Sequence, residues 1–229
     1  MNFENLEKNL NLKFTNRKLL EMAFTHRSYL NESKEEGIES NERLEFLGDS
    51  VLQFLTSEFL YGKYKSDPEG TLTSYRAATV NTNSLSREAL RLELGNYLFM
   101  SKGEEATGGR TRPYIMANTF EALLGALYME FGMEVCEKFL HKELFYKIDA
   151  IVKEEKYKDP KSTLQVVTQE KFGITPIYKV INETGPDHDK VFTAGAFLGD
   201  RILAEGRGPS KQRAEEQAAQ KALEGLKNK

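Results

Sequence analysis

Three acidic residues in the segment NERLEFLGDSVL (41–52) fall on one face of a predicted helix. Glu42, Glu45 and Asp49 are spaced i, i+3 and i+7, so at about 100° per residue their side chains lie within a narrow arc. Like charges at this spacing repel one another and destabilise a helix. A divalent cation would offset that repulsion, and Mg²⁺ prefers carboxylate and other oxygen ligands. A solvated acidic face without a ligand is the alternative interpretation of the same spacing.

Two further features bear on this choice. Gly48 lies beside Asp49, and a glycine in the middle of a helix is costly, so it indicates close packing or the close approach of another group. Asn118 and Glu121 form a second i, i+3 pair, at the start of the apolar helix predicted for ANTFEALLGALYMEFG (117–132). The same pair also fits a capping box, in which Asn118 would be the N-cap residue.

The elements that must position these residues are predicted to be helices throughout residues 1–150. Apolar residues recur with a helical period in 41–64, 74–92, 117–132 and 133–152. In the first of these segments the periodic apolar positions are Leu44, Leu47, Val51, Leu52, Leu55 and Phe59. Phe54, Phe59 and Tyr61 are expected to be core residues. This half of the chain is therefore predicted to be an all-α domain.

The pattern changes after a charged segment at 151–158, which is predicted to link two domains. Three stretches, 175–183, 190–199 and 201–207, are rich in β-branched and aromatic residues and are separated by turn residues. Helical segments at 162–171 and 210–228 flank them. Residues 159–229 are thus predicted to form an α+β domain with the element order α-β-β-β-α.

Composition limits the class of protein. The 229 residues carry a net charge of −3, which by itself argues against a nucleic-acid-binding protein. Residues 207–229, however, hold six basic and three acidic residues, so the end of the chain is locally basic. One cysteine excludes an intrachain disulfide and a cysteine-based zinc site. No stretch approaches the roughly 20 apolar residues of a membrane helix, and a cytoplasmic protein is expected.

The segment NERLEFLGDSVL resembles the signature stretch of the ribonuclease III family. Other blocks that resemble this family follow in the same order as in the family: AFTHRSYLNE (23–32), DPEGTLTSYRAATVN (67–81), FMSKGEE (99–105) and GGRTRPYIMANTFEALLGALYME (108–130). From DPKSTLQ (159–165) onward the chain resembles the double-stranded-RNA-binding domain of bacterial members. The resemblance covers nearly the whole chain and implies 1–150 as a nuclease domain and 159–229 as an RNA-binding domain.

The resemblance implies an endoribonuclease that cuts double-stranded RNA with Mg²⁺, for which Mn²⁺ is a substitute. It implies a homodimer, products with 5′-phosphate and 3′-hydroxyl ends and short 3′ overhangs, and roles in ribosomal RNA processing and in messenger RNA maturation or decay. By matching position, the metal ligands are Glu45, Asp49, Asn118 and Glu121, the catalytic residues are Asp49 and Glu121, and the supporting acids are Glu42 and Glu69.

One position departs from the family pattern. The family usually has Asp where this chain has Asn118. The carbonyl oxygen of Asn can still ligate a hard cation, but one negative charge is lost and metal affinity is expected to fall. A catalytically impaired protein that binds double-stranded RNA is therefore the alternative function.

The resemblance also assigns three RNA-contacting regions in the second domain. Such domains recognise the shape of A-form RNA through phosphates and 2′-hydroxyls, with little sequence preference. The matching residues are Thr163, Gln165 and Gln169 in the first helix, His188 in the loop 185–188, and Lys211 and Arg213 at the start of the last helix. Val166 and Gln212 replace a glutamate and a lysine that the family usually has, which predicts weaker RNA contact.

Overall fold

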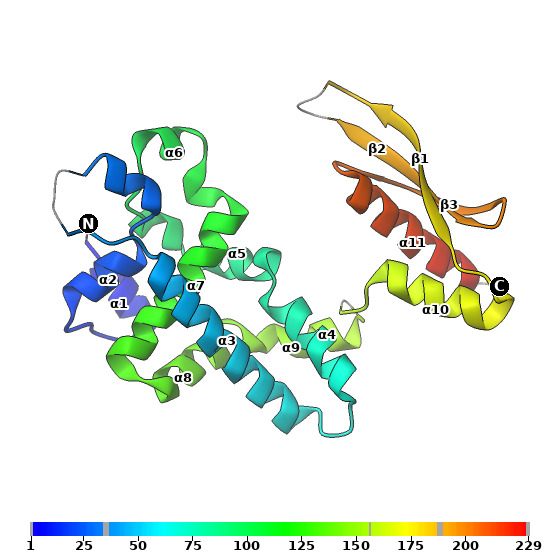
Figure 1. Cartoon of the computed structure of the whole chain (residues 1–229). Helices are drawn as coiled ribbons and strands as arrows, with labels where there is room; N and C mark the ends of the chain where they lie inside the picture. Colours follow the sequence, from blue (N-terminus) through cyan, green and yellow to red (C-terminus); the bar gives the residue numbers. More distant parts are fainter. Residues whose placement is uncertain (1, 34–36, 156, 187–189, 228–229) are drawn as a thin grey trace. The chain divides into compact units, whose positions relative to one another are not determined.

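The computed structural model describes residues 2–33, 37–155, 157–186 and 190–227. The chain forms two compact units, Met1–Tyr157 and Lys158–Lys229, drawn in Figure 1. The first is built from helices, and the second contains a three-stranded sheet with two helices. The predicted fold class, an all-α domain followed by an α-β-β-β-α domain, is confirmed.

Short helices and two long ones make up the first unit. The α-helices are α1 (Glu4–Leu10), α2 (Arg17–Ala23), α3 (Glu42–Lys63), α4 (Glu69–Val80), α5 (Thr82–Arg91), α6 (Lys102–Ala106), α7 (Pro113–Phe131), α8 (Met133–Glu143) and α9 (Ile148–Lys153), and the 3₁₀ helices are η1 (Arg27–Asn31), η2 (Leu94–Tyr97), η3 (Gly109–Thr111) and η4 (Phe145–Lys147). Pro113 occupies the first turn of α7, where its missing N–H costs no hydrogen bond. The Asn81 side chain accepts a hydrogen bond from the Ser84 N–H and so caps α5.

The core of this unit surrounds α7, which packs along α3. Met116, Phe120 and Leu123 of α7 are fully buried, so this helix is central to the unit. On α3 the predicted apolar period is confirmed, because Leu44, Val51, Leu52 and Leu55 are buried while Leu47 and Phe59 are partly buried.

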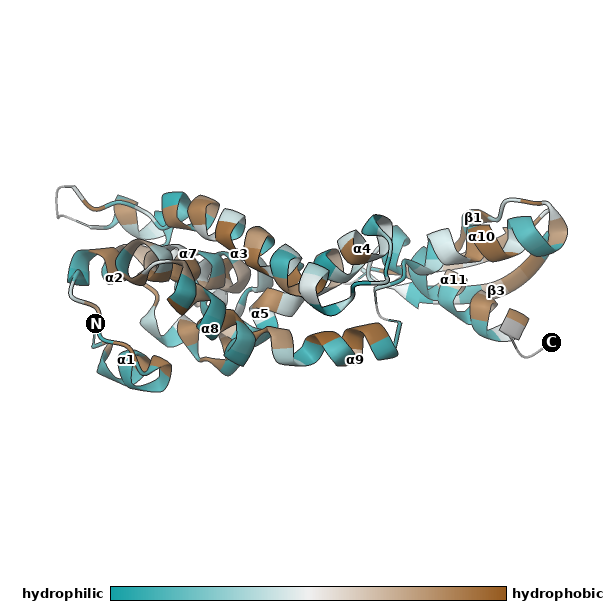
Figure 2. Ribbon diagram, turned by 90° about the horizontal axis from the view of Figure 1, so that it is seen from below, coloured by the Kyte–Doolittle hydropathy of each residue, from teal (hydrophilic) through white to brown (hydrophobic). Residues whose placement is uncertain are grey.

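The expectation that Phe54 and Tyr61 are core residues is wrong. Phe54 is 54% exposed and Tyr61 is 77% exposed. The two residues are seven positions apart, so they share a stripe of α3, and this stripe faces away from the packed core. The alternation of hydrophilic and hydrophobic residues along α3 can be followed in Figure 2.

The second unit is an antiparallel sheet covered by two helices. It consists of α10 (Pro160–Phe172), β1 (Ile177–Thr184), β2 (Val191–Leu198), β3 (Arg201–Gly208) and α11 (Lys211–Lys227), with strand order β1-β2-β3. α11 packs on β3 and β2, and α10 packs against α11. The approach is close, since a Cβ on Gly206 of β3 would lie 2.2 Å from the Ala218 nitrogen of α11. Ala218, Ala219 and Ala222 present the small side chains that this contact requires.

Part of the segment expected to link the domains is folded with the first unit. α9 continues to Lys153, and the Tyr157 ring packs edge-on against Tyr75 with their centroids 4.5 Å apart. Apolar contacts with the helical core thus extend the first unit into the charged segment that suggested a linker, as far as Tyr157. Within the described part of the chain, no helix combines the length and the apolar character needed to cross a bilayer.

Candidate active site

The site is built where α3 and α7 touch through their backbones. A Cβ on Gly48 of α3 would lie 1.8 Å from the Glu121 carbonyl oxygen, and a Cβ on Gly125 of α7 would lie 2.2 Å from the Leu44 carbonyl oxygen. Only glycine allows this approach at either position. The close packing expected from Gly48 is therefore confirmed, and it fixes Asp49 on one helix beside Glu121 on the other.

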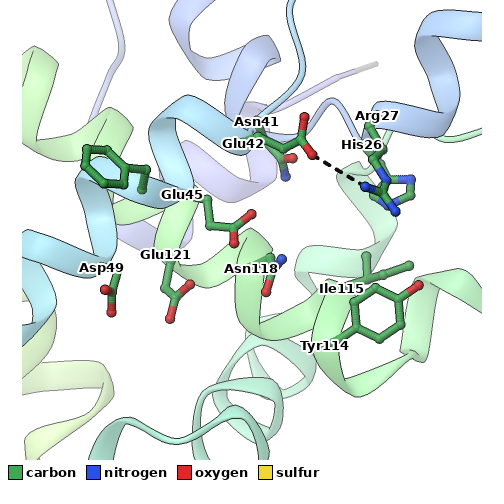
Figure 3. A pocket seen from close by; sticks show the side chains of 11 residues that line it. His26, Arg27, Asn41, Glu42, Glu45, Asp49, Tyr114, Ile115, Asn118 and Glu121 are labelled. Carbon is green, nitrogen blue, oxygen red and sulfur yellow. Dashed lines mark ion pairs between the residues drawn. The ribbon is translucent and has the colours of Figure 1, made fainter.

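The acids predicted to share a face of α3 and the Asn118–Glu121 pair of α7 line one open pocket of about 530 Å³ (Figure 3). α3 contributes Glu42, Glu45 and Asp49, and α7 contributes Asn118 and Glu121. The other described residues that line it are His26, Arg27, Asn41, Phe46, Tyr114 and Ile115. The structure thus brings together five of the six acidic and amide residues that the resemblance assigned to the site.

The capping interpretation of Asn118 is wrong. α7 begins at Pro113 with Arg112 as its N-cap residue, so Asn118 lies in the second turn of the helix. Its side chain instead lines the same pocket as the Glu45 carboxylate of α3 and lowers the pKa of that group, against the larger effect of burial. The i, i+3 spacing of Asn118 and Glu121 reflects a shared helix face that points into the pocket (Figure 3).

Burial and like charge raise the pKa of two carboxyl groups. Burial, followed by repulsion from Asp49 and then Glu45, raises the pKa of Glu121 to about 8. Burial is also the main cause that raises the pKa of Glu45. The Asn118 side chain opposes this increase, and the charges of Glu42 and Asp49 add to it. The metal-free pocket therefore favours a proton on Glu121 at neutral pH, and a bound cation would favour its ionised form.

The oxygen atoms of the pocket differ in their protein partners. Asp49 Oδ1 accepts a hydrogen bond from Gln53 Nε2 at 3.1 Å. Glu42 Oε2 accepts one from Ser40 Oγ at 2.9 Å, and Glu42 Oε1 lies 3.7 Å from Arg27 Nη1. Across the described residues, no three carboxylate, imidazole or thiolate groups lie close enough to enclose a metal ion by themselves. Any cation held here would need the Asn118 amide oxygen, water or substrate oxygens as further ligands.

Glu69 lies outside this pocket. It is the exposed first residue of α4 and accepts a hydrogen bond from Thr73 Oγ1 at 2.8 Å. His26, Arg27 and Tyr114, in contrast, line the pocket without having been assigned to it from the sequence. His26 and Arg27 are adjacent in the block AFTHRSYLNE, and this pair of ionisable residues is the signal that could have marked them as site residues. No periodicity connects the pair with the acids of α3.

The RNA-contact candidates of the second unit lie on its two helices. Thr163 donates from Oγ1 to the Asp159 carbonyl oxygen, and Gln169 Nε2 donates to Thr175 Oγ1. Gln165 and Gln212 line the same shallow pocket, so the start of α10 and the start of α11 are neighbours. His188 lies outside the described residues.

Both basic candidates at the start of α11 are paired with carboxylates. Lys211 Nζ lies 3.7 Å from Glu183 Oε1 of β1. Arg213 Nη1 donates to Glu216 Oε2 at 2.9 Å, and Gln212 Nε2 donates to Glu216 Oε1 at 2.9 Å. The side chains of Lys211 and Arg213 remain 63% and 58% exposed, so an RNA phosphate could displace their partners.

Two family models match the chain. A model described as ribonuclease-III-like matches residues 16–148, and the double-stranded RNA binding motif matches residues 160–226. Ribonuclease 3 of Geobacillus thermodenitrificans is 45% identical over 225 residues, which cover 98% of this chain and 91% of that protein. Ribonuclease 3 of Campylobacter fetus is 41% identical over 221 residues, which cover 96% of each chain.

Solved structures agree with these matches. The nuclease domain of ribonuclease III from Campylobacter jejuni is 38% identical with a TM-score of 0.58, covering 64% of this chain and 95% of that one. A second structure of that domain, described for flexibility in the region involved in dimer formation, gives a TM-score of 0.59 at 38% identity, covering 63% of this chain and 97% of that one. The chain therefore belongs to the ribonuclease III family.

Proposed function

We propose that this chain, an enzyme of the ribonuclease III family, cuts double-stranded RNA with the help of a divalent cation in the pocket between α3 and α7. The observation that carries the proposal is the convergence of Glu45, Asp49, Asn118 and Glu121 from two helices, in a chain whose second domain matches the double-stranded RNA binding motif. The products have 5′-phosphate and 3′-hydroxyl ends with short 3′ overhangs.

The residues present fit a hard divalent cation. Glu45, Asp49, Asn118 and Glu121 offer only oxygen ligands, as Mg²⁺ prefers and Mn²⁺ accepts. Mg²⁺ usually binds one or two carboxylates and completes its coordination with water and substrate phosphates, which agrees with a pocket whose carboxylates do not enclose an ion alone. When bound, such an ion lowers the pKa of a ligated water and stabilises charge on a phosphate.

The chain's own residues have distinct roles in this proposal. Asp49 and Glu121 are assigned as catalytic residues that would hold the cation, and Glu45 and Asn118 would be its further protein ligands. The Asn118 amide lies beside Glu45 and lowers the pKa of its carboxyl group, which opposes the larger effect of burial. Glu42 and Glu69 support the site from its edge and from α4.

RNA binding is assigned to the second domain. Thr163, Gln165 and Gln169 of α10 and Lys211 and Arg213 of α11 would contact the RNA, together with His188. The N-terminus of α11 adds free N–H groups and a favourable helix dipole for a phosphate.

A homodimer is proposed from the apolar stripe on α3. Phe46, Phe54 and Tyr61 are 78%, 54% and 77% exposed, and large apolar residues in a row on one helix favour an interface. Leu47 is partly buried beside this stripe, whereas Leu124 is fully buried and belongs to the core. The biological roles are ribosomal RNA precursor processing and messenger RNA maturation or decay in the cytoplasm.

Asn118 favours a second candidate function, that of a catalytically impaired protein that binds duplex RNA. With one carboxylate fewer than the family pattern, the pocket attracts a cation less strongly.

The test is incubation of a long end-labelled RNA duplex with Mg²⁺ or with EDTA, followed by separation of the strands and analysis of their ends. The proposed enzyme shortens the duplex only with Mg²⁺ and leaves 5′-phosphates. An impaired binder retards the duplex in a native gel with either additive and leaves both strands intact.

A further inference from the structure

Arg27 supplies a fixed positive charge to a pocket dominated by acids. Among the described residues that line the pocket, it is the only one with a permanent positive charge, against the carboxyl groups of Glu42, Glu45, Asp49 and Glu121. Burial lowers the pKa of the neighbouring His26 below its ordinary value of 6.5, so the imidazole is neutral at pH 7. An anionic RNA strand that enters this pocket therefore meets one guanidinium.

The place of Arg27 relative to the acids suggests which part of the RNA it meets. Glu42 and Asp49 are seven residues apart, about 10 Å along α3, and Arg27 lies beside Glu42 at the end of the pocket away from Asp49 (Figure 3). A single phosphate group is much smaller than this separation. A strand with its scissile phosphate near Asp49 and Glu121 thus places a different phosphate near Arg27.

The backbone that carries Arg27 is firmly held. The His26 N–H donates to the Phe99 carbonyl at 2.9 Å, and the Asn41 N–H donates to the Thr25 carbonyl at 2.8 Å. Ser28 Oγ, 2.8 Å from His26 Nδ1, accepts a hydrogen bond from the Ser101 N–H at 3.0 Å. The side chain of Arg27 therefore starts from a fixed point on the pocket wall.

The guanidinium of Arg27, in contrast, is available. Its side chain is 71% exposed, and its ion pair with Glu42 is long, at 3.7 Å. Two other arginines of this unit are committed to the fold: Arg91 bonds to Glu88 at 2.7 Å and to Glu143 at 2.6 Å, and Arg110 donates to two backbone carbonyls. An exposed arginine fork beside a site for RNA suits a phosphate, because its donors match two phosphate oxygens.

We propose that Arg27 binds an RNA phosphate other than the scissile one, and that Glu42 is a positioning residue that orients Arg27. This inference rests on the proposed function and refines the role of Glu42. Both Glu42 oxygens already face protein donors, Ser40 Oγ and the Arg27 guanidinium. Glu42 therefore acts through Arg27 and is not a ligand of the cation.

The test compares Arg27→Gln, Arg27→Lys and a matched control, Arg43→Gln. Arg43 is 85% exposed, pairs with Glu39 at 3.1 Å and is not among the residues that line the pocket. The measurements are kcat and KM for cleavage of a short RNA duplex, over a series of KCl concentrations at saturating Mg²⁺. Thermal unfolding of each variant verifies that it is folded.

Arg27→Gln is expected to lower kcat/KM about tenfold, mainly through KM. It should also reduce the slope of log kcat/KM against log salt by about one, as the loss of one phosphate contact does. Arg27→Lys should recover part of the loss, and Arg43→Gln should stay within about twofold of the wild type. An unchanged KM and slope in Arg27→Gln, or an equal effect of Arg43→Gln, would overturn the inference.

Glu42→Gln tests the positioning role separately. We expect KM to rise about threefold, the Mg²⁺ concentration for half-maximal activity to stay unchanged, and little further effect when Arg27 is already Gln. A higher Mg²⁺ requirement in Glu42→Gln would make Glu42 a cation ligand and refute its role as a positioning residue. A wild type that fails to cut RNA with Mg²⁺ would refute the proposed function itself, which is a different result from an active wild type with an insensitive Arg27→Gln.

Discussion

The two domains carry their charged residues in opposite arrangements. In the pocket between α3 and α7, Glu45, Asp49 and Glu121 lie together, and burial with mutual repulsion raises the pKa of Glu45 and Glu121. At the start of α11, Lys211 and Arg213 each face a carboxylate. The pocket thus holds an excess of negative charge that a cation would relieve, whereas the α11 surface is balanced before RNA arrives.

The pocket between α3 and α7 would gain stability from a bound cation, whereas the basic residues of α11 would exchange carboxylate partners for RNA phosphates. Exposed ion pairs contribute only about 0–1 kcal/mol, so RNA phosphates can replace Glu183 and Glu216 at small cost. In the pocket, a ligand does not have to replace an ion-pair partner in this way. The geometry of the pocket is set by two helices whose backbones are in contact at Gly48. The backbones that carry the proposed catalytic residues are accordingly in close contact, whereas the proposed RNA-contacting side chains Lys211 and Arg213 are mostly exposed.

The largest expected effect is the loss of cleavage in Glu121→Gln. The substitution removes a negatively charged ligand, so kcat should fall about 10³-fold or more, while duplex affinity in a native gel stays within about twofold. Glu134→Gln, which changes an exposed glutamate paired with Lys138 on α8, serves as the control. Cleavage by Glu121→Gln within tenfold of the wild type would remove Glu121 from the catalytic group.

Gly48→Ala tests the rigid support of the pocket. An added Cβ would overlap the Glu121 carbonyl oxygen at 1.8 Å, and the unfolding free energy should fall by about 3 kcal/mol or more. Gly62→Ala is the matched control on the same helix, because its Cβ would have no atom within 4 Å, and it should be neutral or stabilising by up to about 1 kcal/mol. Equal urea midpoints for the two variants would contradict the close crossing of α3 and α7.

Asn118→Asp tests whether the number of carboxylates in the pocket determines its affinity for Mg²⁺. A fourth carboxylate beside Glu45, Asp49 and Glu121 should lower the Mg²⁺ concentration for half-maximal cleavage about tenfold. Asn118→Ala, which removes the amide oxygen, should raise it. A Mg²⁺ titration of cleavage that moves in the same direction for both variants would show that residue 118 does not contribute to cation binding.

The smallest effect is expected at α11. Glu216→Gln frees Arg213 from its ion pair and should tighten duplex binding about two- to threefold at low salt, with the gain disappearing as salt screens the charges. Glu224→Gln is the control, because Glu224 accepts a hydrogen bond from Gln220 further along the same helix. Binding that responds equally to both changes would reflect net charge and not release of Arg213.

Local patterns predicted much of this molecule, and contacts between distant segments account for what they missed. The acids of α3 were identified because helical spacing is visible in a single segment, and the role of Gly48 followed from its cost within a helix. The meeting of α3 with α7 is a tertiary contact, and it was expected only from the family resemblance. Arg27 precedes α3 by fifteen residues, so no periodicity could assign it to the pocket.

Two further errors concern the interpretation of single segments. Asn118 was open to a capping interpretation because the start of α7 was placed too late, although Pro113 was a signal for the first helical turn. Phe54 and Tyr61 were expected in the core because their apolar character alone does not distinguish a core from an exposed stripe. The pairing of Lys211 with Glu183 joins a helix to a strand, which no spacing rule connects.

The unbalanced negative charge of the pocket is proposed to hold a cation. The pKa of Glu121 is raised to about 8, so in EDTA its contribution to stability is lost as the pH rises from about 4.5 through 8. A cation should reverse this loss at pH 8, where Glu121 is about half ionised. It should act more weakly at pH 6, where it must displace a proton.

The most direct measurement is the thermal midpoint of the wild type and of Glu121→Gln at pH 8, in EDTA and in 10 mM Mg²⁺. For a dissociation constant near 1 mM, Mg²⁺ should raise the wild-type midpoint by about 4 °C. The increase should be smaller at pH 6 and nearly absent in Glu121→Gln. A wild-type midpoint that does not respond to Mg²⁺, or an equal response of both proteins, would contradict the assignment of this pocket to a divalent cation.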